Sequence, residues 1–165
     1  DKNIVAYVDG YNQYLKVFYK GEDIVLENTR PKKFKTGDDM VAYIDNTREF
    51  KVFYNGEIIS LSSFEPDFFT ITDNIMLYKD NSVYKVFYKG QVYELGNYLS
   101  EDHQQDSNAL VYRDGGGQVN VFFEGQFQIV TKEIVSKFSL TKNTLLFYTG
   151  PNDVHIFYKG KIVSL

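Results

Sequence analysis

Acidic residues recur at one place in this sequence, at the end of a short apolar segment. Asp9, Asp45, Asp80 and Asp114 each follow such a segment, and Thr149 takes the position in the last copy. Carboxylates suit Ca²⁺, so a cation site at each position is one interpretation. Each segment supplies only one carboxylate, however, without the dense spacing of a metal-binding loop. Since Asp commonly hydrogen-bonds its own downstream backbone, we predict that these residues cap turns and that the protein holds no metal or other cofactor.

A cationic position follows each of these acidic positions. Lys16, Lys51 and Lys85 occupy it in the first three copies, and Asn120 and His155 replace them in the last two. The lysines could form a partial ring of cations around a channel. The interpretation we favour is that their aliphatic stems cover aromatic rings while the ammonium groups reach water.

Residues for nucleophilic catalysis are sparse. The chain has no Cys, and its two histidines, His103 and His155, lie in different copies without metal-ligand spacing. A hydrolase needs an oriented base beside its nucleophile, and no glycine elbow or serine motif frames one. The glycines at 115–117 lie between predicted strands, which indicates a flexible loop and not a phosphate cradle. We therefore predict that the protein is not an enzyme, with a propeller hydrolase or lyase as the less favoured alternative.

The composition argues against two classes of partner. The 165 residues include 18 Lys and Arg against 22 Asp and Glu, a net charge of -4. Nucleic-acid binding relies on basic residues that neutralise phosphates, so we expect no nucleic acid. No apolar run approaches the roughly 18 residues of a membrane-spanning helix, so we expect no membrane insertion. Abundant Lys, Asn, Ile, Tyr and Phe favour a bacterial source, and the start at Asp1 predicts a processed or trimmed N-terminus.

One motif occurs five times along the chain. Its copies are "LKVFYKG", "FKVFYNG", "YKVFYKG", "VNVFFEG" and "VHIFYKG". Their last residues are Gly21, Gly56, Gly90, Gly125 and Gly160, which are separated by 35, 34, 35 and 35 residues. Such a fixed period is the signature of a repeat architecture.

Each copy of about 35 residues contains segments of strand length. Upstream of the motif lies an alternating segment such as "NIVAYVD", downstream a short one such as "DIVL", and then a fourth such as "KFKTG". Asn55-Gly56 is the strongest signal for a type I′ hairpin turn. The mid-strand aromatic residues could be sugar-stacking platforms, but we predict that they pack between repeats; they are Tyr7, Tyr43, Tyr78, Tyr112 and Phe147.

A four-stranded meander that is apolar on both faces needs a neighbour on each side. Stacking such sheets around an axis gives a β-propeller. We predict an all-β, five-bladed β-propeller of antiparallel meander blades, in a single domain over 1–165 with repeats at about 1–37, 38–72, 73–106, 107–141 and 142–165. The alternatives are an open array of hairpins and one segment of a larger propeller. The fourth segment occurs only four times, so either one blade has three strands or, as we favour, the missing strand lies beyond an end of the chain.

The pattern "VAYxD…KVFYxG" extends over the whole chain and resembles short-repeat β-propeller domains of secreted or envelope-associated bacterial proteins. The resemblance implies a binding platform and a secreted, periplasmic or cell-surface location. The chain lacks the Trp-Asp dipeptide, and its period is shorter than those of WD40 and kelch repeats.

Length varies between copies in one place only, the loop before the repeated motif. These loops, "DGYNQY", "DNTRE", "DNSV", "DGGGQ" and "TGPND", are expected at the same sheet edge as the long connections between repeats. Because recognition residues concentrate on variable loops, we predict a binding module that recognises a protein or glycan there. Alternatives are ordinary solvated loops and a structural spacer or assembly domain of a larger protein, and we expect a monomer or part of a larger chain. The candidate contact residues are Tyr11, Tyr14, Arg48, Phe64, Tyr98 and Asp102.

Overall fold

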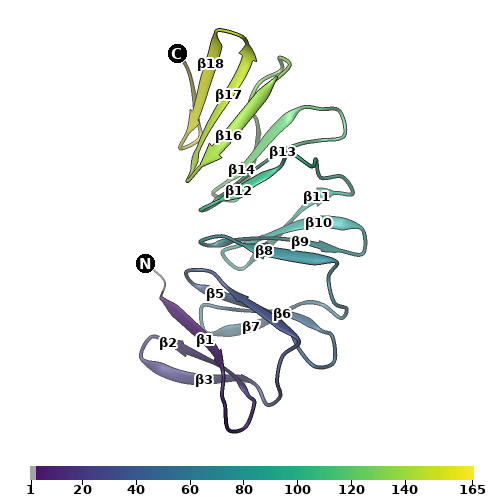
Figure 1. The fold of residues 1–165 in the computed structure, drawn as a ribbon, viewed down its shortest axis with the longest axis vertical. Coiled ribbons are helices and arrows are strands. Elements are labelled where there is room, and N and C mark those ends of the chain that lie inside the picture. Colours follow the sequence, from purple (N-terminus) through teal and green to yellow (C-terminus); the bar gives the residue numbers. More distant parts are fainter. Residues whose placement is uncertain (1–2) are drawn as a thin grey trace. The chain divides into compact units, whose positions relative to one another are not determined.

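The computed structural model describes residues 3–165, and within that range all regular elements are β-strands. Nineteen strands form five antiparallel sheets, each an unbroken meander (Figure 1). This confirms the predicted all-β fold of five meander blades. In the same residues, no helix is long and apolar enough to cross a membrane.

The blades follow one another in chain order. The first contains β1 (Ile4–Val8), β2 (Leu15–Tyr19) and β3 (Glu22–Glu27). The second contains β4 (Lys33–Thr36), β5 (Met40–Ile44), β6 (Phe50–Tyr54) and β7 (Glu57–Ser62). The third contains β8 (Phe68–Ile71), β9 (Ile75–Asp80), β10 (Val83–Tyr88) and β11 (Gln91–Gly96). The fourth contains β12 (Gln104–Asp106), β13 (Ala109–Arg113), β14 (Val119–Phe123) and β15 (Gln126–Ile129). The fifth contains β16 (Lys137–Thr141), β17 (Thr144–Gly150), β18 (Asp153–Tyr158) and β19 (Lys161–Ser164).

The chain divides into two compact units, Asp1–Val92 and Tyr93–Leu165, with the division inside β11. The first unit contains the first two blades and most of the third. The second contains the fourth and fifth blades.

The fourth segment of each repeat pairs with the next repeat. In the second blade, Phe34 of β4 lies opposite Tyr43 of β5, and β8 and β16 pair with β9 and β17 in the same way. Among residues 3–165, the first blade therefore contains three strands, β1 to β3.

All five hairpins that follow the repeated motif have the same backbone conformation. Asn55 and Gly56 have φ angles of 50° and 87°. Positive φ at both central residues defines a type I′ turn, whose twist matches that of paired strands. The prediction for Asn55-Gly56 is therefore confirmed, and the other four turns share the pattern: Lys20-Gly21, Lys89-Gly90, Glu124-Gly125 and Lys159-Gly160.

The core of the first unit lies between successive blades. Leu15 and Val17 of the first blade form one buried cluster with Val41, Tyr43 and Phe53 of the second blade. The second and third blades share another cluster, which includes Met40, Val52, Met76, Tyr78 and Phe87.

The second unit repeats this arrangement. Val111 and Val121 of the fourth blade cluster with Leu145, Phe147 and Phe157 of the fifth. The repeated mid-strand aromatic residue is thus core in the later blades, as predicted. In the first blade it is Tyr7, which is 37% exposed.

Candidate functional site

Each blade has a loop edge and a turn edge. The loop edge carries the variable loops 9–14, 45–49, 81–82, 114–118 and 151–152 together with the connections between blades, and the turn edge carries the type I′ turns. A meander places alternate connections at opposite edges, which is how the sequence predicted this division. The predicted contact residues all belong to the loop edge.

The first unit presents four of the predicted residues. Tyr11 is 98% exposed and Phe64 is 67% exposed. Arg48 is also exposed, whereas Tyr14 is only partly exposed. The loop edge of the first unit therefore displays two exposed aromatic side chains, Tyr11 and Phe64, and the exposed cation of Arg48. Their role in binding stays a prediction.

Tyr98 and Asp102 belong to the second unit, and both are exposed. Asp102 accepts a hydrogen bond from Nε of Arg113 at 2.8 Å. Burial raises the pKa of Asp102, but hydrogen bonds from Arg113 and Ser100 outweigh it and hold that pKa below its ordinary value. Asp102 is therefore an ionised residue that already has a structural partner.

The acidic residues at the strand ends organise the variable loops. Oδ1 of Asp9 accepts the backbone N–H of Tyr11 at 2.8 Å, and Oδ1 of Asp45 accepts that of Glu49 at 3.0 Å. Asp114 accepts two backbone N–H groups of its loop in the same way. The predicted turn-capping role is confirmed for these three residues, and a carboxylate fixes the base of each of their loops. The carboxylate of Asp80 accepts hydrogen bonds from the side chains of Ser62 and Lys85.

The same carboxylates bind the recurring lysines. The ammonium groups are held by ion pairs rather than reaching freely into water, which revises that part of the sequence interpretation. In the fourth blade, Nδ2 of Asn120 donates to Asp114 at 3.2 Å instead. The Nζ–O distances are 2.7 Å for Lys16–Asp9, 2.9 Å for Lys51–Asp45 and 3.0 Å for Lys85–Asp80.

Lys51 lies at the centre of the most developed of these networks. Its Nζ is 2.9 Å from Asp45 and 2.9 Å from Glu27, and it is 3.5 Å from Glu49. Burial lowers the pKa of Lys51, but the hydrogen bonds that its ammonium group donates to Glu27 and Asp45 raise that pKa well above its ordinary value. Glu27 also accepts the hydroxyl of Tyr43 at 3.1 Å. Because Glu27 ends β3 of the first blade, this network fastens that blade to the loop edge of the second.

The fifth blade replaces the Asp–Lys pair with Thr149 and His155. Nε2 of His155 lies 3.0 Å from Oγ1 of Thr149 and 3.2 Å from Oδ1 of Asp153. Nδ1 of His155 lies 2.9 Å from Oγ of Ser164, and its ring stacks on Phe147 with centroids 5.0 Å apart. Sequence reasoning missed this Ser–His–Asp chain because Ser164 comes from a separate strand.

The backbone N–H next to Ser164 already has a partner. A serine hydrolase commonly uses backbone N–H groups near the nucleophile to stabilise the oxyanion. The N–H of Leu165, the residue after Ser164, donates instead to the carbonyl of Val154 at 2.9 Å. In residues 3–165 no group of three or more His, Cys, Asp and Glu side chains is arranged to hold a metal ion.

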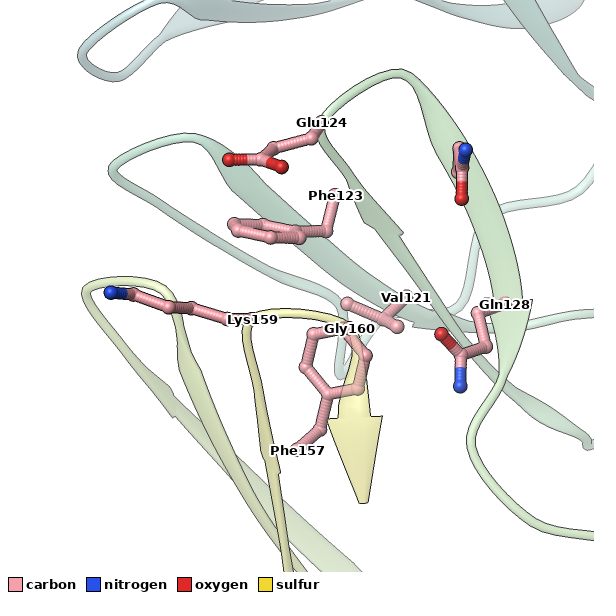
Figure 2. A pocket seen from close by; sticks show the side chains of 8 residues that line it. Val121, Phe123, Glu124, Gln128, Phe157, Lys159 and Gly160 are labelled. Carbon is pink, nitrogen blue, oxygen red and sulfur yellow. The ribbon is translucent and has the colours of Figure 1, made fainter.

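Small grooves lie at the turn edge between blades. In the second unit, a cavity of about 200 Å³ lies between the turns of the fourth and fifth blades (Figure 2). Phe123 and Phe157 line it beside Glu124, Gln128 and Lys159, whose polar groups surround the rings in Figure 2.

A groove at the same place in the repeat occurs in the first unit. It measures about 410 Å³ and is lined by Phe18, Tyr19, Lys20 and Asp39, among others. The signal that could have located the grooves was the aromatic residue directly before every turn.

Comparisons with known proteins agree with this architecture. A model of the family described as "10-bladed beta propeller domain" matches residues 1–163. No curated protein matches the chain significantly.

Several solved structures are similar to the chain at low sequence identity. The computationally designed Ika8 protein is 19% identical, with a TM-score of 0.40, over 99% of this chain and 58% of that one. Hsv2 of Kluyveromyces lactis is 9% identical, with a TM-score of 0.46, over 99% of this chain and 59% of that one. Prp20p of Saccharomyces cerevisiae, described with binding properties to Gsp1p and histones, is 11% identical, with a TM-score of 0.45, over 98% of this chain and 57% of that one. The chain thus spans less than three fifths of the length of these structures.

Proposed function

Since the chain belongs to the 10-bladed β-propeller domain family, we propose that it is a non-catalytic interaction module that binds a protein through its loop edge. The observation that carries the proposal is the combination of fixed loop bases with fully exposed loop tips. Asp9 holds two backbone N–H groups of its loop, while Tyr11 at the tip is 98% exposed. A preorganised loop loses little conformational entropy on binding.

The residue types at this edge suit a protein surface. Tyr and Arg are enriched among residues that dominate protein–protein binding energy. Tyr11 and Phe64 offer apolar area, and Arg48 offers a cation on a backbone of φ 76°, which its N–H bond to the carbonyl of Asp45 helps to fix. The two grooves at the turn edge lie opposite this surface, and the loop edge offers protruding side chains.

A second candidate function is recognition of a glycan at the turn-edge grooves. The supporting observation is the groove in Figure 2, where aromatic rings adjoin the amide of Gln128 and the charged groups of Glu124 and Lys159. Phe157 is buried, so the partly exposed ring of Phe123 is the one that can stack on a sugar, while the polar groups hydrogen-bond its hydroxyls. A secreted or cell-surface location would fit either function and stays part of the proposal.

The test screens the whole chain against a phage-displayed peptide library and a glycan array. Binders are then measured by biolayer interferometry with Tyr11→Ala, Arg48→Ala, Phe64→Ala and, at the turn edge, Gln128→Ala. Val92→Ala is a matched control, because Val92 is 45% exposed on the outer strand β11. We expect loss of peptide binding by about tenfold or more for at least one loop-edge variant.

Three outcomes distinguish the candidates. Peptide binding lost only through Tyr11, Arg48 or Phe64 supports the protein-binding loop edge. Glycan binding lost only through Gln128 contradicts it and supports the grooves. Binders that all four variants retain, or a chain that binds neither library, would contradict both and favour a structural spacer.

A further inference from the structure

Two connections between blades of the first unit share one backbone arrangement. Pro31 is buried in the connection between the first and second blades, and Pro66 is buried in the connection between the second and third. The residue after each proline, Lys32 or Asp67, donates its backbone N–H to a carbonyl on the second strand of the following blade. The N–O distances are 2.9 Å for Lys32–Ile44 and 3.1 Å for Asp67–Lys79. The two connections are therefore structurally equivalent.

The residues on either side of the buried proline have opposite charge in the two connections. Arg30 and Lys32 occupy these positions in the first connection, and Glu65 and Asp67 occupy them in the second. All four residues are exposed. Because the backbone arrangement is the same with either charge, the fold requires neither a cation nor an acid at these positions. The charges are therefore available for a contact with another molecule.

The first connection is anchored to the second blade at both ends. Glu27, which ends β3, pairs with Nζ of Lys51 at 2.9 Å, and Lys32 is held through its backbone N–H. Between these ends, Nη1 of Arg30 donates to Oε1 of Gln13 in the neighbouring variable loop, at 3.4 Å. Both blades that flank this connection belong to the first unit, so the surroundings of its cations are described on both sides.

Three exposed cations gather on this part of the loop edge, namely Arg30, Lys32 and Arg48. Arg30 and Lys32 are two residues apart, at most about 7 Å along the backbone. This separation is within a Debye length, about 10 Å at 0.1 M salt, so their fields add. Arg48 belongs to the loop that starts at Asp45, directly after Ile44, whose carbonyl accepts the N–H of Lys32. Within residues 3–165 none of the three cations forms an ion pair, so their charge is available to a partner.

We propose that this surface binds a short acidic peptide segment of a partner protein, whose carboxylates pair with Arg30, Lys32 and Arg48. The inference rests on the proposed function, in which the loop edge binds a protein, and it names the chemistry of that partner. Guanidinium groups suit such a segment because they can donate two parallel hydrogen bonds to one carboxylate. Glu65 and Asp67 of the next connection repel a continuous polyanion along the edge, which favours a short acidic segment over nucleic acid or a sulfated polysaccharide.

The first test asks which peptides the chain selects. Selection of a random phage-displayed peptide library on the natural chain at low salt should enrich sequences rich in Asp and Glu. Synthetic copies of the enriched peptides, measured by biolayer interferometry, should bind more weakly as the NaCl concentration rises, because salt screens exposed charges. Copies with Asn and Gln in place of Asp and Glu should bind more weakly by about tenfold or more.

The second test reverses charges on the surface itself. Arg30→Glu and Lys32→Glu should each weaken binding of the enriched acidic peptides by about tenfold or more, since like charges then face each other. Lys161→Glu is the matched control with the same change of charge. Lys161 is exposed beside the turn of the fifth blade, and Glu22 and Glu57 occupy the equivalent position in the first two blades, so a blade accepts glutamate there. Far-UV circular dichroism verifies that all variants remain folded.

The outcomes separate this inference from the proposed function. Acidic peptides whose binding falls in both Arg30→Glu and Lys32→Glu, but not in Lys161→Glu, support it. Enriched peptides without an excess of acidic residues, or acidic peptides that both reversal variants retain, overturn it. Phe64→Ala then decides whether the proposed function stands, since loss of binding in that variant keeps the loop edge as the site.

Heparin is the probe for a polyanion other than a peptide. Binding of heparin that both reversal variants remove, without any enriched peptide, overturns the inference in favour of a sulfated polysaccharide. A chain that selects no peptide and binds no heparin overturns both the inference and the proposed function.

Discussion

Replacing Lys51 with methionine should lower the free energy of unfolding by about 2 kcal/mol. Methionine keeps most of the aliphatic stem, so the change removes the ammonium group and little packing. It leaves Asp45 and Glu27, whose side chains are only 5% and 19% exposed, near each other without their shared cation. Breaking a fully buried ion pair costs about 3–5 kcal/mol, and the residual solvent access of this site reduces that figure.

Lys16→Met is the matched control, since Lys16 holds the equivalent position in β2. Its acidic partners Asp9 and Asp23 are more exposed, with side chains at 23% and 46%. Water screens such pairs, so the loss should be clearly smaller than at Lys51. The difference tests whether the contact of Glu27 across two blades makes the Lys51 network the stronger one.

Urea unfolding followed by circular dichroism measures both variants against the natural chain. An unchanged m-value would show that the denatured state is not the source of the difference. Equal losses for the two variants, or a loss below about 0.5 kcal/mol for Lys51→Met, would refute the reasoning, because exposed ion pairs contribute that little.

Two further predictions concern acid and close packing. Burial raises the pKa of Asp45, but the hydrogen bonds that Lys51 and Thr47 donate to it outweigh burial and lower its pKa below the ordinary value of 3.8. The ionised Asp45 therefore stabilises the folded protein above pH 3.8, and this stabilisation is lost as the pH falls through the lowered pKa. The free energy of unfolding should therefore drop between about pH 5 and pH 2, and drop less in Asp45→Asn; an identical slope would contradict this. Gly37→Ala places a methyl group against the backbone carbonyl of Asp73 and should cost about 1–3 kcal/mol in thermal or urea unfolding. Gly10→Ala, which meets no atom within 4 Å, should cost clearly less, and similar losses would contradict the steric argument.

The blades could be predicted from sequence because their signals are local and repeated. Alternation over each strand and a glycine every 34 or 35 residues determine the strands and their turns. It was harder to predict to which sheet the fourth segment of each repeat belongs. The repeat period is the same whether this segment pairs with a strand of its own repeat or with a strand of the next one. Only the pairing of Phe34 with Tyr43 decides it.

Burial depended on position in the chain as much as on residue type. Tyr7 and Tyr43 have nearly the same local sequence, yet Tyr7 is 37% exposed and Tyr43 is fully buried. The difference is that a preceding blade packs on Tyr43. Comparing the copies of the repeat with one another does not show which copy has no blade packed against this face. Sequence reasoning therefore predicted that both Tyr7 and Tyr43 are core residues.

From the sequence, the candidate site could be predicted only as the loop edge of the blades, without the contacts that its residues make. Exposure of Tyr11 and Phe64 follows from their loops, but the hydrogen bond that Arg113 donates to Asp102 joins segments with no sequence relation. The distribution of these residues between two compact units was also beyond any periodic signal.

The acidic and cationic series are one structural feature. The separation between partners is seven residues for Asp9 and Lys16 but five for Asp80 and Lys85, because the loop between the strands changes length while the hairpin pairing does not. A fixed-spacing search therefore misses the pairs. The one copy that loses its acidic residue at this position also has histidine in place of lysine, at position 155. The partners have changed together within a single chain, as expected if each repeat preserves a contact at the base of its loop rather than a charge at either position. What varies freely between copies is the loop above that contact, and this is the part that a partner would reach.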